Sequence, residues 1–108
     1  MVAQLDVHTL KGLLDAGASV YLVDVRQPWE HERACLPDHA LIPLDELPQR
    51  LDELDPPEGA LVVAYCHHGV RSLSAAAILQ NGGFSRVASL AGGIDRWSLQ
   101  IDPKIARY

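Results

Sequence analysis

The chain has 108 residues, the length of one domain, so we expect a single domain over residues 1–108. Hydrophobic residues make up 48% of it and charged residues 21%, which excludes a largely disordered chain. The longest apolar run, Ala60–Cys66, is much shorter than the roughly 20 residues that cross a bilayer. Because the N-terminus lacks the features of a secretory signal, we expect a cytoplasmic protein with no membrane partner. A formal net charge of −5 argues against nucleic acid as a partner.

Strands and helices are predicted to alternate along the chain. Residues 20–25 and 60–65 are nearly continuous apolar runs rich in β-branched residues, typical of parallel strands buried on both faces. Alternation of strands with helices predicts an α/β fold with a parallel sheet. In chain order we expect an edge strand at Leu5, a helix from Val7, the strand 20–25, a short strand at 40–42, a helix over 44–54, the strand 60–65, a helix capped by Ser72 and stopped by Gly82, a strand at 86–90 and a helix over 93–99.

The segment 66–72, with the sequence Cys-His-His-Gly-Val-Arg-Ser, follows the predicted central strand and enters the next helix. Open α/β sheets bind ligands at the carboxyl ends of their strands. A tight loop at a helix N-terminus directs backbone N–H groups inward and binds anions, and Gly69 allows the tight turn. Those amides and Arg71 would stabilise the thiolate of Cys66. We therefore interpret Cys66 as a nucleophile rather than as a buried structural cysteine.

Several blocks of the chain together resemble the rhodanese family of single-domain sulfurtransferases. The loop 66–72 resembles the family's active-site loop, residues 24–26, Glu30 and 42–44 resemble its early signature, and residues 90–94 with Trp97 resemble its closing one. The resemblance implies a five-stranded, mainly parallel sheet with helices on both faces. It also implies that Cys66 is catalytic and that the other loop residues bind substrate: His67, His68, Gly69, Val70, Arg71 and Ser72.

The resemblance implies a thiosulfate sulfurtransferase without cofactor or metal. In this family the loop cysteine takes the outer sulfur of thiosulfate or a persulfide donor, forms a persulfide, and passes the sulfur to cyanide or a thiol. The implied partners are a small anionic sulfur donor, such an acceptor, and a sulfur-carrier or thioredoxin-like protein. We expect His67 and His68 to line the loop rather than act as a base, and Arg26 and Glu30 to form a structural ion pair with each other.

Cys35 departs from the family pattern, because it stands where a histidine is usual before Pro37. It either resolves the Cys66 persulfide by forming a disulfide or is an inert thiol under the sheet, and we favour the inert thiol.

Three alternatives stay open. A cysteine-dependent phosphatase also places Cys and Arg around an anion loop, but with five intervening residues, whereas four separate Cys66 from Arg71. Zinc ligation by residues of the segments 35–39 and 66–68 is a second alternative, with spacings that match no familiar zinc motif. The third is a relay domain that delivers sulfur to a partner protein without turnover. It is suggested by the tail 101–108, which resembles the end of rhodanese domains fused to enzymes that activate sulfur-carrier proteins.

Overall fold

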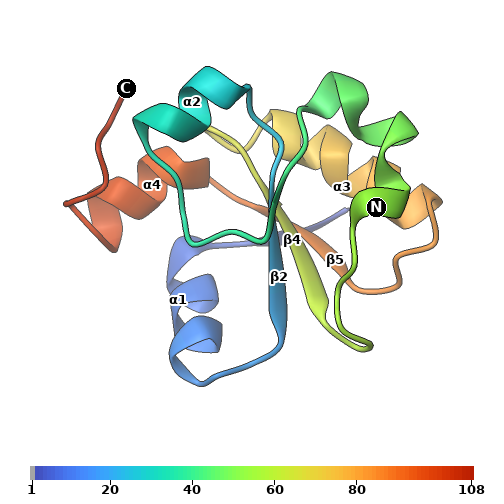
Figure 1. The fold of residues 1–108 in the computed structure, drawn as a ribbon. Helices are drawn as coiled ribbons and strands as arrows, with labels where there is room; N and C mark the ends of the chain where they lie inside the picture. The colour runs from blue at the N-terminus through green and yellow to red at the C-terminus, as the bar shows by residue number, and fades with distance from the viewer. Residues whose placement is uncertain (1) are drawn as a thin grey trace.

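The computed structural model describes residues 2–108 and contains a five-stranded sheet in which all neighbouring strands are parallel (Figure 1). The strands are β1 (Ala3–Leu5), β2 (Val20–Asp24), β3 (Ala40–Leu41), β4 (Leu61–Tyr65) and β5 (Val87–Leu90). Their order in the sheet is β1-β5-β4-β2-β3, so the strands β2 and β4 lie side by side. This confirms the predicted α/β fold and the edge position of the strand that contains Leu5.

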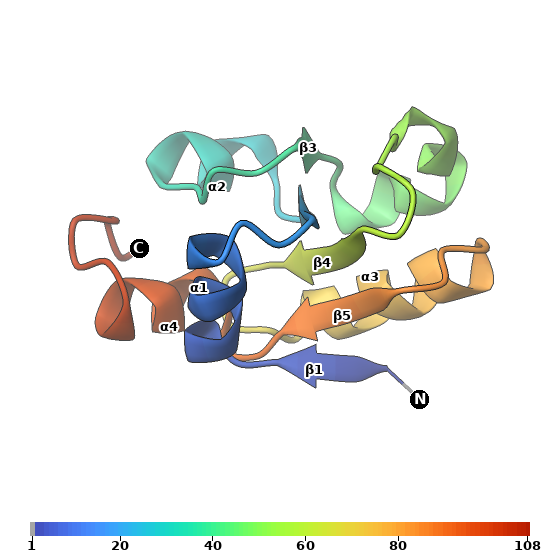
Figure 2. The same ribbon diagram turned by 90° about the horizontal axis from the view of Figure 1, so that it is seen from below.

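Helices cover both faces of the sheet. The helix α1 (Val7–Asp15) packs with α4 (Gly93–Gln100) on one face, where Leu10 and Trp97 share a core cluster. On the other face, α3 (Arg71–Asn81) contributes Ala75 and Leu79 to a second cluster. Figure 2 shows α1 in front of the sheet and α3 behind it. Among residues 2–108, no helix combines the length and the apolar character that a membrane crossing requires.

The strand β4 is buried on both faces, as its nearly continuous apolar sequence predicts. Val62 and Ala64 point into the cluster under α3, whereas Val63 and Tyr65 point into the cluster under α1 and α4. Side chains alternate between the faces of a strand, so an apolar run of this kind needs a hydrophobic core on each side.

The expected helix over 44–54 is wrong in type. The chain forms two 3-10 segments there, η1 (Leu44–Gln49) and η2 (Leu51–Glu53). Pro48 lies inside η1, and a proline has no N–H for the hydrogen bonds of an α-helix. The apolar spacing does indicate which residues face the core, because Leu47 and Leu54 are buried in a core cluster.

The short helix α2 (Pro28–Arg33) was not expected from periodicity. Its six residues are too few for an amphipathic repeat, but its start carries a local signal. Pro28 occupies the first turn, and the Glu30 carboxylate accepts a hydrogen bond from the Gln27 backbone N–H at 3.0 Å. In Figure 1, α2 lies near the C-terminal end of the chain.

The pairing of β2 with β4 brings the segments that follow these two strands to one edge of the sheet. Asp24 pairs with Tyr65, and the Val25 N–H then donates to the Tyr65 carbonyl at 3.1 Å. The residues that follow these strands, Arg26 and Cys66, therefore leave the sheet at the same end.

The expected ion pair between Arg26 and Glu30 is wrong, because each side chain has another partner. Arg26 donates from Nε and Nη2 to the two carboxylate oxygens of Asp24, at 2.8 and 2.7 Å. Both side chains are fully buried. Burial opposes the charge of Arg26, but the hydrogen bonds to Asp24 and Tyr108 outweigh it and raise its pKa. Glu30 pairs instead with Arg71.

Asp24→Asn is expected to lower the free energy of unfolding by about 3–5 kcal/mol, because it leaves the buried Arg26 cation without a counter-charge. Urea unfolding followed by circular dichroism measures this. Asp15→Asn is the matched control: it breaks the exposed pair between Lys11 and Asp15 and should change stability little. Equal losses in the two variants would contradict the assigned importance of the buried pair.

Candidate active site

The thiol of Cys66 lies at the carboxyl end of β4 and is enclosed by the loop that follows. The residue is only 1% exposed. Its Sγ accepts hydrogen bonds from the backbone N–H groups of Gly69, at 3.2 Å, and Ser72, at 3.3 Å. Two amides and the N-terminal end of α3 thus face one sulfur atom, an arrangement that stabilises a thiolate.

The loop is held in shape by close backbone contact with the segment before α4. Gly69 has φ +95°, and a Cβ there would lie 2.9 Å from the Gly92 nitrogen. On the other side, the Ile94 N–H donates to the Cys66 carbonyl at 2.9 Å, and the Asp95 N–H donates to the His67 carbonyl at 3.1 Å. The first turn of α4 therefore donates hydrogen bonds to two carbonyl groups of the loop. The amides of Gly69 and Ser72 remain directed at the sulfur.

Ser72 is a polar neighbour of the sulfur rather than the expected helix cap. The helix α3 begins at Arg71, with Val70 at the N-cap position and no side-chain cap. The buried Ser72 Oγ lies 3.5 Å from Cys66 Sγ and 2.7 Å from Ser89 Oγ. Ser89 was not expected at the site, although a serine in an otherwise apolar strand was an available signal.

Arg71 is not a free cation in the loop, because Glu30 binds it with both carboxylate oxygens. The paired nitrogen and oxygen atoms lie 2.6 and 2.8 Å apart. Burial alone would raise the pKa of Glu30, but hydrogen bonds from Arg71, the Gln27 amide and Tyr108 lower it to about 2. The same pairing raises the pKa of Arg71. The expected attraction of anions to Arg71 is therefore reduced by a paired negative charge, and the pair fixes the start of α3 against α2.

Tyr108 joins the site from the far end of the sequence and was not expected there. Its hydroxyl donates to Glu30 Oε2 at 2.8 Å and accepts from Arg26 Nη1 at 2.8 Å. Its ring stacks on the His67 imidazole, with 3.9 Å between ring centroids. Burial raises the pKa of Tyr108 to about 12, so the hydroxyl is protonated at neutral pH.

The two loop histidines have different surroundings. His67 is stacked between Tyr108 and His68, and its Nε2 atom is the one buried side-chain nitrogen or oxygen in residues 2–108 without a hydrogen-bond partner. Burial and the neighbouring His68 lower the pKa of His67, which favours a neutral ring. The His68 side chain is 62% exposed and lies 3.8 Å from Asp95. Val70 is also strongly exposed, at 73%.

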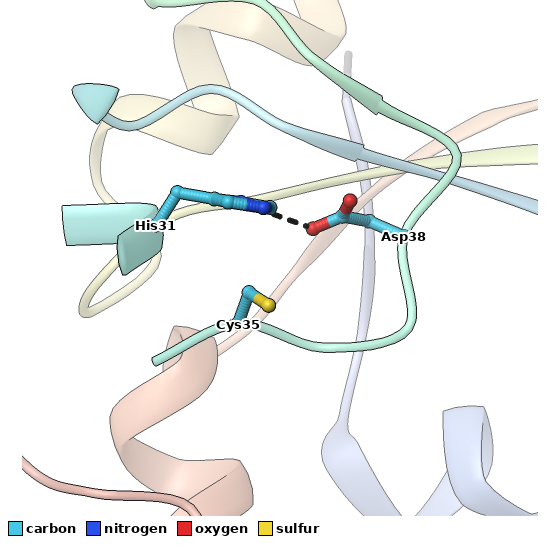
Figure 3. Close-up of side chains that lie close together, drawn as sticks. All are labelled: His31, Cys35 and Asp38. Atoms are coloured by element: carbon cyan, nitrogen blue, oxygen red, sulfur yellow. Dashed lines mark ion pairs between the residues drawn. The ribbon is translucent and has the colours of Figure 1, made fainter. Parts of the chain in front are cut away.

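Cys35 lies outside this loop, and its expected position under the sheet is wrong, because it is exposed. Figure 3 shows its sulfur beside His31 and Asp38. Although the residue is exposed, its thiol is partly covered, and this partial burial and the nearby Asp38 raise the pKa of Cys35. His39, grouped with Cys35 in the zinc alternative, instead stacks on Tyr21 and accepts a hydrogen bond from the Leu22 N–H at 3.1 Å.

Comparison with known proteins identifies the family. The rhodanese-like domain matches residues 6–100, so the chain belongs to the rhodanese-like domain family. A curated sulfurtransferase of Allochromatium vinosum is 37% identical over 98% of this chain and 97% of its own length. Sulfur transfer is therefore the activity that the family membership supports.

Two further relatives show the same domain alone and within a longer protein. The human single domain sulfurtransferase TSTD1 superimposes with a TM-score of 0.76 and 25% identity, over 93% of this chain and 98% of that one. The probable adenylyltransferase/sulfurtransferase MoeZ of Mycobacterium tuberculosis is 34% identical over 92% of this chain but only 25% of its own length.

Gly69→Ala is expected to reduce sulfur-transfer activity strongly, because the added methyl group meets the Gly92 backbone and displaces the Gly69 amide from Cys66. Gly17→Ala is the matched control, since Gly17 also has a positive φ of 73° but has nothing within 4 Å of the place that a methyl group would take. Both variants should lose about 1 kcal/mol of stability from the left-handed backbone. Sulfur-transfer rates measure the difference, and equal rates would contradict the importance of the loop shape.

Glu30→Gln is expected to destabilise the protein at neutral pH, with a difference from wild type that shrinks in acid. A carboxylate with a lowered pKa stabilises the fold above its ordinary pKa of 4.5 and stops doing so as the pH falls to about 2. Chemical unfolding at a series of pH values between about 2 and 7 measures this. Glu58→Gln, which makes the same change at an exposed side chain, is the matched control, and a constant difference between Glu30→Gln and the wild type would contradict the assignment.

Proposed function

We propose that this protein is a thiosulfate-type sulfurtransferase that carries sulfur as a persulfide on Cys66. The observation that carries the proposal is the pair of backbone amides, Gly69 and Ser72, directed at Cys66 Sγ. A thiolate and a persulfide are both anions, so the same donors stabilise the enzyme before and after it takes sulfur.

The reaction consists of two displacements. The Cys66 thiolate attacks the outer sulfur of thiosulfate, the S–S bond of thiosulfate breaks, and sulfite leaves with the bonding electron pair. The anionic Cys66 persulfide then gives its outer sulfur to cyanide, which yields thiocyanate and restores the thiolate, or to a thiolate acceptor. Charge and atoms balance in both steps without a cofactor, and covalent storage predicts ping-pong kinetics.

The surroundings of Cys66 favour a small donor. Because the residue is almost fully buried, the loop has to change its conformation before a large donor can reach Sγ. The transferred sulfur would stand about 2 Å beyond Sγ, a disulfide bond length, and is easier for an acceptor to reach. The loop residue His67 contributes a further hydrogen-bonding group, its unpartnered Nε2 atom. Val70 and His68 form the exposed side of the loop.

A relay role is the second candidate, in which Cys66 receives sulfur from one protein and delivers it to a sulfur-carrier or thioredoxin-like protein. The observation in its favour is the similarity to part of MoeZ, whose name combines an adenylyltransferase with a sulfurtransferase. The residues around Cys66 serve both roles, so the two candidates differ in the acceptor and in the rate of turnover. We propose a cytoplasmic location for either role.

Thiosulfate treatment is expected to add one sulfur atom to the wild-type protein, and cyanide should remove it as thiocyanate. Cys66→Ser should gain none, because it lacks the thiolate nucleophile. Cys35→Ser is the matched control and should load and release sulfur as the wild type does, since Cys35 lies outside the loop. Intact-protein mass spectrometry measures all three.

Sulfur loading on the Cys66→Ser protein would contradict the assignment of the nucleophile. A wild-type protein that takes sulfur from thiosulfate only slowly, yet transfers it rapidly to a protein thiol, would favour the relay. If Cys35→Ser leaves both the release of sulfur and the reducibility of the protein unchanged, the resolving role of Cys35 is excluded.

A further inference from the structure

A second cluster of reactive side chains lies beside the sheet and has no part in the proposed sulfur transfer. One ligand atom each from His31, Cys35 and Asp38 lies within 4.8 Å of the other two. His31 belongs to α2, and the other two residues follow in the segment before β3. Figure 3 shows the imidazole and the carboxylate directed at each other, with the sulfur between them and to one side.

We propose that His31, Cys35 and Asp38 bind a divalent cation of the zinc type. Nitrogen, thiolate sulfur and carboxylate oxygen are the three ligand types that zinc uses in proteins. Three protein ligands leave the fourth position of a tetrahedral site for water. The proposal does not depend on sulfur transfer, because the hydrogen bonds of Cys66 Sγ go to Gly69 and Ser72 and to none of these three residues.

The geometry requires only a small contraction. The zinc bond lengths and a tetrahedral angle place ligand atoms about 3.3–3.6 Å apart. His31 Nδ1 already lies 3.6 Å from Asp38 Oδ2. The remaining adjustment falls on Cys35, which is exposed and lies outside any helix or strand, so rotation of its side chain brings the sulfur closer.

The charges around the cluster match a divalent cation. The nearby Arg26 is the main argument against a metal, but both oxygens of Asp24 bind its guanidinium and neutralise it. What remains is the Asp38 carboxylate and, once a metal displaces its proton, the Cys35 thiolate. Two negative charges and a neutral imidazole then surround a charge of +2.

Neighbouring side chains hold two of the ligands in place. The Tyr65 hydroxyl donates to Asp38 Oδ2, and a hydrogen-bonded partner of this kind orients a ligand in known metal sites and raises its affinity. Asp24 Oδ2 lies 3.0 Å from His31 Nδ1 and holds the imidazole in the cluster before a metal binds. A metal at Nδ1 takes the place of this contact and requires the ring proton to be on Nε2.

Titration of the reduced Cys66→Ser protein with Co²⁺ tests the proposal, because this background leaves Cys35 as its one thiol. We expect one equivalent of Co²⁺ to bind with a thiolate-to-cobalt charge-transfer band, one proton to be released, and Zn²⁺ to abolish the band. The double variant with Cys35→Ser should lose the band. His31→Ala and Asp38→Asn should weaken Co²⁺ binding by at least about tenfold. Loss of a residue that only hydrogen-bonds to a metal ligand already has an effect of this size, so loss of a ligand itself should have no smaller one.

His8→Ala is the matched control, since His8 is exposed on α1 and pairs with Gln100; it should bind Co²⁺ as the background does. Asp38→Asn weakens the hydrogen bond from the core residue Tyr65, so circular dichroism must show that the variant is folded. Because Cys35 is exposed, we expect Cys35→Ser to fold, and this variant still tests the proposal if Asp38→Asn unfolds. No thiolate band in the Cys66→Ser background, or a band that His31→Ala leaves unchanged, would overturn the proposal.

Discussion

A single buried guanidinium group connects three separate parts of this protein: the end of β2, the helix α2 and the C-terminal residue Tyr108. Arg26 is completely buried, and its five side-chain hydrogen bonds reach the end of β2 at Asp24, the carbonyl groups of Glu30 and Ala34, and the hydroxyl of Tyr108. A buried cation with unpaired donors costs several kcal/mol, so each of these segments has to meet the guanidinium for the fold to be stable.

The contacts of Arg26 extend to the candidate active site. By holding the backbone of α2 and the hydroxyl of Tyr108, Arg26 helps to place the Glu30 carboxylate, which in turn binds Arg71 at the start of α3. The first turn of α3 supplies one of the two amides directed at Cys66. Charged groups thus set the position of the loop, while uncharged backbone amides contact the sulfur. This division explains why Arg71 is largely neutralised by Glu30 yet still matters for the site.

Local sequence signals predicted the parts of the structure that depend on near neighbours. The apolar runs of β2 and β4 require burial on both faces, and Gly69 permits a turn that other residues resist. Predictions from short-range patterns were wrong where another residue or another interaction competed with the pattern. Pro48 interrupts the helical spacing of residues 44–54, and Ser72 finds Ser89 and Cys66 as partners instead of capping its helix.

The sequence by itself determined the family, the α/β fold and the placement of Cys66 in an amide-lined loop, because each of them can be recognised from short stretches of neighbouring residues. Only the tertiary structure decided which charges pair. Arg71 and Glu30 are 41 positions apart, and Tyr108 and Arg26 are 82 apart. Arg26 had two acidic neighbours in sequence, Asp24 and Glu30, and it pairs with Asp24, which is fully buried beside it. Electrostatic pairing depends on distance and solvent exposure in three dimensions, and spacing along the chain specifies neither.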